Sequence, residues 1–421
     1  MKVMVVGGGI SGLTMAMSLH QIGVPVRVYE AVREVSPLGV GLNLQPNGVR
    51  ELIELGLGEE LARIGTATRN LCFFNKFGQP VWREPRGRDA GFDWPQYSIH
   101  RGKLQVMLTE ATRARLGNEA VRTGHQFQRL EQRGDKVVAW FLDRQTGQIV
   151  EDEADILVGA DGIHSAVRRQ FYPGEGEPLF AGQILWRAAV DARPFLDGAT
   201  MAIAGHFHQR IVAYPIGPGS KPGTLLTNWI AQMTVETVAP PREDWNRKVG
   251  KERFFDTFGH WKFDWLDFPA LVDSTNEIFE FPLVDRHPVD RWSFDRVTLI
   301  GDAAHPMQPT GSQAGSQAIV DARMLTAALL ADRDPVAALG KYDAFRRPVM
   351  NDITLRNRGF GPEAAMQLAE ERAPQGFANI EHVIPRDELE SISRGFQQAA
   401  GLDATTLNAR PSFVPAGVRL S

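Results

Sequence analysis

The first thirty residues constrain the fold of this chain more than any other stretch. Residues 1–6 form a short apolar run, typical of a buried strand, that leads directly into Gly7-Gly-Gly9-Ile-Ser-Gly12. Apolar residues then recur at helical spacing until Gly23, which favours the end of a helix. A second strand is predicted over residues 24–29, and Glu30 follows it directly. The segment therefore predicts a strand, a glycine-rich turn, a helix and a second strand.

The glycines of this unit have the spacing G-x-G-x-x-G, which binds the pyrophosphate of a dinucleotide. Gly7 allows the tight turn, Gly9 lets the pyrophosphate approach the backbone, and Gly12 lets helix and strand pack closely. Glu30, 18 residues after Gly12, is placed to accept hydrogen bonds from ribose hydroxyls. The alternative is a glycine-rich turn followed by a surface glutamate. The motif predicts dinucleotide binding without deciding between FAD and NAD.

Two later strands end in acidic residues that suit the same kind of fold. The apolar residues 154–160 lead into Asp161-Gly162, and residues 297–300 lead into Gly301-Asp302. In doubly wound sheets, ligands bind at the carboxyl ends of the strands. After Asp302, a loop with two prolines and two glycines precedes a helical pattern, and its amides would suit an electron-rich group. Each segment taken alone is also compatible with an ordinary turn between a strand and a helix.

Composition narrows the classes of function. A chain of 421 residues can bury a sizeable core and form two domains. A net charge of −4, with 23% charged residues, indicates neither nucleic acid nor an anionic membrane as a partner. The single cysteine, Cys72, lies in an apolar run and suits a reducing cytoplasm as a buried thiol. The sequence contains no apolar run of 18 residues and no Cys/His cluster, so we expect neither a membrane span nor a metal site.

Strand-like segments dominate from Glu177 to Phe281, and helical patterns follow Leu330. We therefore expect a β-rich domain inserted into a nucleotide-binding domain, in an α/β fold. Single helices are predicted over residues 48–64 and from Tyr97 to Leu116, and the last 20 residues are expected to be loosely ordered. The expected division is 1–70, 99–176 and 284–360 for the nucleotide-binding domain, 71–98 and 177–283 for the β-rich domain, and 361–421 for a C-terminal helical segment and tail.

Taken together, Gly7 to Gly12, Asp161-Gly162 and Gly301-Asp302 resemble the three motifs of the single-component FAD-dependent aromatic hydroxylases. The order and spacing agree over about residues 1–360, and the run from Gln96 to Gly102 is similar to that of phenazine-hydroxylating members. The resemblance implies a Rossmann-like FAD-binding domain with an inserted β-rich substrate domain and C-terminal helices. It also implies FAD as cofactor and NADH or NADPH as transient electron donor.

The same resemblance implies roles for single residues. Gly7 to Gly12 and Glu30 would hold the AMP half of FAD, and Asp302 would bind the ribityl chain. The sequence departs from many relatives at Gly311-Ser-Gln-Ala-Gly315, which leaves the roles of Ser312 and Gln313 open. The full set of expected cofactor-binding residues is Gly7, Gly9, Ser11, Gly12, Glu30, Gly41, Arg101, Asp161, Gly162, Asp302, Gly311, Ala314 and Gly315.

The reaction implied is hydroxylation of an aromatic or N-heteroaromatic ring, a phenazine-like carboxylate among them, through a flavin C4a-hydroperoxide formed with O₂. Carbonyls near Pro309 could contact the oxygen, and His305 either relays a proton or packs as a structural histidine. Arg187, beside Trp186 in an apolar strand, either binds a carboxylate or pairs with an acid. The expected substrate contacts, each of which could instead be core packing, are Trp186, Tyr214, Asn228, Trp229, Phe281 and Met307.

Three other functions compete with the hydroxylase. A flavin-dependent reductase or dehydrogenase could use the same fold. A halogenase would need the W-x-W-x-I-P pattern, which Trp261-Lys-Phe-Asp-Trp265 does not match. A non-catalytic module that binds prenylated proteins also shares the fold. For the hydroxylase, the expected partners are a small aromatic substrate and O₂, with the chain as a monomer or homodimer.

Overall fold

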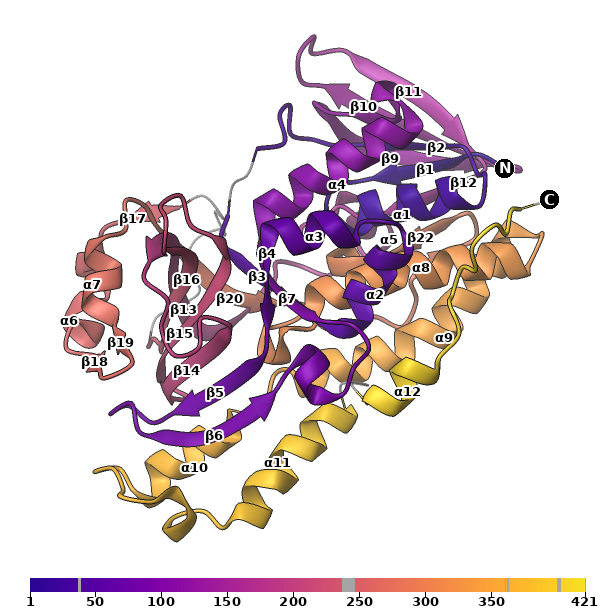
Figure 1. Cartoon of the computed structure of the whole chain (residues 1–421). Helices are drawn as coiled ribbons and strands as arrows, with labels where there is room; N and C mark the ends of the chain where they lie inside the picture. The colour runs from indigo at the N-terminus through magenta and orange to yellow at the C-terminus, as the bar shows by residue number, and fades with distance from the viewer. Residues whose placement is uncertain (37–38, 237–246, 360, 362, 400–402, 421) are drawn as a thin grey trace.

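Two large β-sheets organise the chain (Figure 1). The computed structural model describes all residues except 37–38, 237–246, 360, 362, 400–402 and 421. A six-stranded sheet, mainly parallel, is surrounded by the N-terminal helices and the long helices that follow residue 313. An eight-stranded sheet lies beside it (Figure 1). The fold is α/β, with a Rossmann-like sheet and a separate β-rich part, as the sequence predicts.

The six-stranded sheet has the order β21-β22-β12-β1-β2-β8. At its centre, β1 (Val3–Val6) and β12 (Ile156–Gly159) pair in parallel, and β22 (Val297–Leu299) pairs in parallel with β12. These three strands are buried along their whole length, because both helices and the small three-stranded sheet of residues 125–154 pack against them. Their uninterrupted runs of branched apolar residues suit such burial. The remaining strands are β2 (Val26–Tyr29), β8 (Val121–Arg122) and β21 (Ser293–Phe294).

The eight-stranded sheet has the order β17-β20-β13-β16-β15-β14-β5-β6. Along β13 (Leu179–Ala192) and β16 (Leu225–Thr234), successive side chains point to opposite faces. One face packs Trp186 and Trp229 against the short helices after residue 254, and the opposite face carries the alternate residues. The other strands are β5 (Asn70–Phe74), β6 (Pro80–Pro85), β14 (Thr200–His206), β15 (Gln209–Pro218), β17 (Lys248–Val249) and β20 (Ile278–Asp285). The sheet therefore combines residues 70–85 with residues 179–285, while the domain boundaries remain a proposal.

A three-stranded sheet of order β3-β7-β4 lies between the two large sheets (Figure 1). It consists of β3 (Gly41–Leu44), β4 (Gly65–Thr68) and β7 (Gln96–His100). The smaller strands elsewhere are β9 (His125–Arg133), β10 (Lys136–Asp143), β11 (Ile149–Ala154), β18 (Lys262–Phe263) and β19 (Leu266–Asp267). The helices are α1 (Ile10–Gln21), α2 (Pro46–Glu54), α3 (Gly58–Ile64), α4 (Arg101–Leu116), α5 (Ala166–Phe171), α6 (Phe255–Phe258), α7 (Phe268–Asp273), α8 (Ala314–Ala331), α9 (Pro335–Arg356), α10 (Ala364–Arg372), α11 (Arg386–Ala399) and α12 (Ala404–Ala409).

Three expectations about elements are wrong in detail. The helix expected over residues 48–64 is two helices, α2 and α3, separated by Gly56 with φ +74°. Tyr97 to His100 belong to strand β7, and α4 begins only at Arg101. The C-terminal segment is anchored, because Val414 is buried and the Leu420 amide donates to the Ile22 carbonyl at 2.9 Å. Local patterning did not reveal this anchoring, since its partners lie at the other end of the chain.

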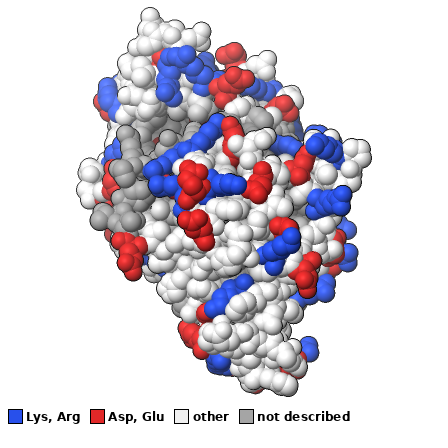
Figure 2. All heavy atoms as spheres, turned by 90° about the vertical axis from the view of Figure 1, so that its left-hand side faces the viewer, with Lys and Arg blue, Asp and Glu red and all other residues white. Residues whose placement is uncertain are grey.

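Charged side chains of both signs are interspersed on the face that carries α6 and α7 (Figure 2). Within the part of the chain that the structure describes, no helix is both long and apolar enough to cross a bilayer. The hollows that could bind a ligand lie at the strand ends of the six-stranded sheet and beside the eight-stranded sheet.

Candidate active site

Three strand ends that are far apart in sequence lie side by side. The register pairs Val6 with Gly159 and Gly159 with Leu299, so β1, β12 and β22 end at one edge of the sheet. Gly7, Asp161 and Asp302 follow these ends. The neighbouring segments also touch, because a Cβ on Gly301 would lie 2.9 Å from the Ser11 hydroxyl. The edge where the sequence predicts ligand binding is therefore a single continuous feature.

The glycines of the first turn differ in what surrounds them. A Cβ on Gly7 would lie 2.3 Å from the Ala160 carbonyl oxygen, and φ at Gly7 is +108°. A Cβ on Gly12 would lie 2.0 Å from the Gly7 carbonyl oxygen. A Cβ on Gly9 would meet no atom of the described residues within 4 Å. Gly7 and Gly12 are thus required by packing, whereas Gly9 leaves open space at the N-terminus of α1, where a pyrophosphate fits.

Glu30 stabilises the same turn directly. Its Oε2 accepts a hydrogen bond from the Gly8 amide at 2.6 Å, and its Oε1 accepts one from the Val32 amide at 2.9 Å. Each carboxylate oxygen retains a lone pair for a further donor. Glu30 lines a cleft together with Gly7, Gly9, Arg101, Asp161 and Gly162, which brings together six of the expected cofactor residues.

Asp161 organises the helix that follows it. Its Oδ2 accepts hydrogen bonds from the amides of Ala166 at 2.7 Å and Val167 at 3.1 Å, and Ser165 donates to Oδ1. Burial raises the pKa of Asp161 above its ordinary value, against these hydrogen bonds. The carboxylate therefore caps α5 and sets the position of the adjacent Gly162 backbone in the cleft.

Asp302 lies deep in the fold and is nevertheless accessible. Burial raises the pKa of its carboxyl, against the opposing charges of His305 and Arg101. Its side chain is exposed to solvent. Asp302 does not line the cleft that contains Glu30, but it follows the adjacent strand end. An accessible acceptor at this point fits a polyhydroxylated chain such as the ribityl group expected from sequence.

His305 has the surroundings of a structural histidine, the alternative that the sequence leaves open. Its ring is buried against Trp292, and its Nε2 lies 2.5 Å from Oδ2 of Asp321. It lies in neither the cleft nor the substrate pocket described below. The geometry therefore does not support a proton relay through His305.

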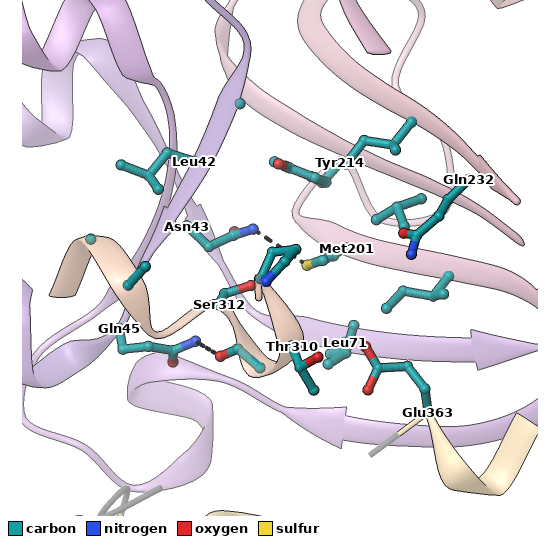
Figure 3. Close-up of a pocket in the computed structure, with 18 of the residues that line it drawn as sticks. Leu42, Asn43, Gln45, Leu71, Met201, Tyr214, Gln232, Thr310, Ser312 and Glu363 are labelled. Carbon is teal, nitrogen blue, oxygen red and sulfur yellow. Dashed lines mark hydrogen bonds between the residues drawn. The ribbon is translucent and has the colours of Figure 1, made fainter. Parts of the chain in front are cut away.

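A second pocket lies between the loop that precedes α8 and the eight-stranded sheet (Figure 3). Leu42 and Asn43 of β3 lie on one side, and Tyr214 and Gln232 lie on the other (Figure 3). The loop contributes Pro309, Thr310, Gly311, Ser312, Ala314 and Gly315 to its wall. Most of the remaining wall is apolar, with a few polar groups, as is typical of sites for small organic ligands.

Arg187 enters this pocket from β13. Its Nη2 donates to the Gly41 carbonyl at 2.7 Å, and it also bonds the Tyr214 hydroxyl. Its Nε has no hydrogen-bond partner, and no acid of the described residues pairs with it. Burial lowers the pKa of Arg187. Of the two readings that the sequence allows, pairing with an acid is excluded within the described residues, which leaves a guanidinium that faces the pocket.

Asn228 also contacts Gly41, because its Oδ1 accepts the Gly41 amide at 2.7 Å. A Cβ on Gly41 would lie within 2.8 Å of both Asn228 and Tyr214. Glycine at this position therefore permits β3 to approach the eight-stranded sheet. Asn228 positions this backbone, and it does not itself line the pocket.

Three of the expected substrate contacts lie elsewhere. Trp186 donates to Glu280 at 2.8 Å and Trp229 donates to Thr275 at 2.9 Å, both within the apolar cluster on the far face of the sheet. Met307 packs in the core of the nucleotide-binding part, and Phe281 lies on the pocket face near Arg187 without lining the cavity. Tyr214 is the one expected contact that lines it. The two tryptophans are core residues, because alternation along their strands turns them away from the pocket.

Sequence reasoning missed several polar residues that line the pocket, among them Arg210, Gln232 and Glu363. Arg210 stands in an apolar strand, as Arg187 does, and that pattern could have identified it. Glu363 lies in a polar stretch after α9 and carries no comparable signal.

Comparison with known proteins agrees with this geometry. The family model described as "FAD binding domain" matches residues 1–357. A phenazine 1,6-dicarboxylic acid hydroxylase of Lysobacter antibioticus is 42% identical over 85% of this chain and 89% of its own. A 3-amino-4-hydroxybenzoate 2-monooxygenase of Streptomyces cremeus is 32% identical over 86% and 87%. A Klebsiella pneumoniae protein solved with FAD and uric acid has the same fold, with a TM-score of 0.74, 24% identity, and coverage of 95% of this chain and 96% of its own.

Proposed function

Because the chain belongs to the FAD binding domain family, we propose that it uses NAD(P)H and O₂ to hydroxylate an aromatic or N-heteroaromatic carboxylate. The observation that carries this proposal is the apolar pocket with Arg187 at its wall, bounded on one side by the loop of Pro309 to Gly315. The relatives at 42% and 32% identity act on a carboxylated phenazine and a carboxylated benzene ring by their names. The substrate of this chain is proposed to share the aromatic ring and the carboxylate.

FAD fits the residues at the strand ends. Gly9 and Glu30 would hold its adenosine and pyrophosphate, Asp302 its ribityl chain, and the segment Gly311 to Gly315 the edge of its ring system. When bound, FAD accepts electrons from NAD(P)H and activates O₂ for transfer to the substrate ring. The protein supplies binding, orientation and the exclusion of water.

The pocket residues divide this work between them. Leu71, Ile203 and Val212 form apolar walls against which an aromatic ring excludes water. The Arg187 guanidinium binds the substrate carboxylate through its free N–H groups, and the Tyr214 hydroxyl orients the guanidinium. A carboxylate there would offset the cost of a half-buried arginine without an acidic partner. The Arg187 guanidinium thereby fixes the orientation of the substrate ring relative to the flavin.

The assembly and the compartment complete the proposal. We propose a monomer or homodimer in the cytoplasm, where a chain with one cysteine, half-buried Cys72, suits reducing conditions.

The rival functions differ in what they predict. A reductase on this fold would oxidise NAD(P)H without transferring oxygen to a product, and a prenyl-protein-binding module would not need to retain FAD.

The test measures NAD(P)H oxidation by the purified flavoprotein with a panel of aromatic acids, and product mass under ¹⁸O₂. Phenazine-1-carboxylate and unsubstituted phenazine form a matched pair that differs only in the carboxylate. We expect faster oxidation with the acid, and a product that carries one oxygen atom from ¹⁸O₂. Arg187→Leu should remove most of the preference for the acid. Oxidation that no aromatic compound accelerates, or a product without ¹⁸O, would contradict the proposal.

A further inference from the structure

The pocket has a second polar end, formed by Arg210, Gln232 and Glu363. None of these residues takes part in the interactions of Arg187 described above. Arg210 and Gln232 face each other across β15 and β16, and Glu363 immediately precedes α10. Figure 3 shows Gln232 and Glu363 entering the same cavity from different elements. This end has its own donors and acceptors.

Arg210 is half-buried and has few partners. Its Nε donates to Oε1 of Gln232 at 3.2 Å, and no carboxylate oxygen of the described residues lies within 4.0 Å of its nitrogens. Gln232 is itself held, because its Nε2 donates to Oε1 of Gln183 at 2.5 Å. Burial lowers the pKa of Arg210, against the attraction of Glu363. The guanidinium is therefore oriented by Gln232, and its remaining N–H groups are available to a ligand.

Glu363 supplies the complementary acceptor. Its Oε2 is buried and has no hydrogen-bond partner. It acts on Arg210 electrostatically without forming an ion pair with it. A buried carboxylate oxygen without a donor is costly, so its presence at a cavity wall indicates that a ligand donor completes it. The end of the pocket thus offers donors and an acceptor that do not satisfy each other.

The charges of the pocket divide between its two ends. The lining contains Arg86, Arg187, Arg210 and Glu363 as charged residues. Arg86 is paired with Glu84 at 2.5 Å, and Glu363 offsets Arg210. In their ordinary ionised forms these groups leave one positive charge, at Arg187. A single carboxylate at Arg187 neutralises the pocket, so the group at the other end should be neutral.

The sheet register places the two arginines far apart. Arg187 pairs with Ile230, Ile230 pairs with Val212, and Arg210 lies two residues before Val212. Two strand spacings and one two-residue step separate their Cα atoms by roughly 12 Å. A ligand that reaches both ends needs more than one ring, which favours fused-ring substrates.

We propose that Arg210 and Glu363 recognise a neutral hydrogen-bonding edge, a donor beside an acceptor, at the end of a fused-ring substrate remote from its carboxylate. A lactam or amide has this chemistry, because its C=O accepts from Arg210 and its N–H donates to Glu363. The inference deepens the proposed function and rests on it for the carboxylate at Arg187. It defines the substrate class as a fused-ring monocarboxylate with a lactam-like edge.

The experiment compares two probes on the oxidised FAD-loaded enzyme, with binding followed by the change in flavin absorbance. 2-Oxo-1,2-dihydroquinoline-6-carboxylate carries the lactam edge on the ring remote from its carboxylate, and quinoline-6-carboxylate lacks the lactam. We expect the wild-type enzyme to bind the lactam acid about tenfold more tightly, because two charge-assisted hydrogen bonds are added. Glu363→Ala and Arg210→Met should each reduce this ratio to within about twofold, mainly by weakening the lactam acid.

The control is Glu371→Ala, the same substitution at an exposed position of α10, which should leave the ratio unchanged. Equal binding of the two acids by the wild type, no binding of either acid, or a ratio that survives both pocket variants would overturn the inference. These outcomes are separate from the ¹⁸O₂ assay. If the enzyme hydroxylates aromatic acids but binds the two probes equally, the proposed function stands and this inference fails. If it binds the lactam acid selectively but transfers no oxygen, this inference stands and the proposed function fails.

Discussion

Asp321 of α8 accepts a hydrogen bond from the His305 ring at 2.5 Å, and both side chains are almost wholly buried. Arg346 of α9 donates to the same carboxylate at 2.7 Å, and the Gly301 amide donates to it at 2.9 Å. The carboxylate therefore joins two helices to the segment that carries Asp302. His305 thus helps to anchor the segment that carries Asp302, and this role of the histidine is structural.

Asp321→Asn should destabilise the fold and loosen the cofactor segment together. Removing one partner of a buried ion pair leaves His305 and Arg346 uncompensated, so we expect a loss of about 3–5 kcal/mol in the free energy of unfolding. The measurement is urea unfolding, together with the flavin retained after purification. Asp352→Asn, which breaks an exposed pair with Arg356, should cost less than about 1 kcal/mol. Similar losses in the two variants would argue against the anchoring role.

The same carboxylate predicts a pH dependence. Burial alone would raise the pKa of Asp321, but the charges of His305 and Arg346 lower it to about 2. A folded-state pKa below the unfolded value stabilises the protein above about pH 4, and this contribution, about 2 kcal/mol, disappears as pH falls towards 2. The difference in unfolding free energy between wild type and Asp321→Asn should therefore shrink from pH 4 to pH 2. A difference that stays constant over this range would contradict the lowered pKa.

Two glycines of the first turn should respond differently to alanine. Gly12→Ala places a Cβ 2.0 Å from the Gly7 carbonyl, so we expect a loss of about 1–3 kcal/mol in stability. Gly9→Ala meets open space, so the unfolding free energy should change by less than about 1 kcal/mol, while FAD affinity falls because the pyrophosphate is obstructed. Thermal unfolding and FAD titration of the apoproteins separate the two effects. A Gly9→Ala protein with unchanged FAD affinity would show that the cofactor does not approach this turn.

Asp302→Ala should separate cofactor binding from folding. Burial raises the pKa of Asp302, so its ionised form destabilises the FAD-free protein near neutral pH, and the substitution should leave stability unchanged or increased. The flavin absorbance per protein should nevertheless fall, because an acceptor for the ribityl chain is lost. Full flavin content in this variant would contradict the role given to Asp302.

Pocket and core residues of the eight-stranded sheet can be distinguished by their kinetics. Tyr214→Phe removes the hydroxyl that orients Arg187, so KM for an aromatic acid should rise about three- to tenfold while stability changes little. Trp229→Phe loses the hydrogen bond to Thr275 in the core, so stability should fall by about 1–3 kcal/mol with KM unchanged. Steady-state kinetics and urea unfolding of both variants provide the comparison. A raised KM in Trp229→Phe would place that ring in the substrate site after all.

The parts of the site that sequence predicted are those formed by short contiguous segments. Each of the three strand ends combines an apolar run with Gly or Asp directly after it, and the parallel register then brings them to one edge. The substrate side was predicted less well. The strands that carry Arg187 and Trp229 were recognised, but a strand with buried residues on both faces does not show which face meets the pocket.

By itself the sequence determined the α/β class, the glycine-rich first turn and the three strands whose ends meet at one edge, because glycine conformation and hydrophobic periodicity act within a few residues of each other. Only the tertiary structure decided that His305 is an anchor, that Trp186 and Trp229 belong to the core, and that Arg210 and Glu363 share one cavity. Arg210 and Glu363 are about 150 residues apart, and no local preference connects them. Their encounter depends on how α10 packs against the eight-stranded sheet, through apolar contacts that many sequences could provide.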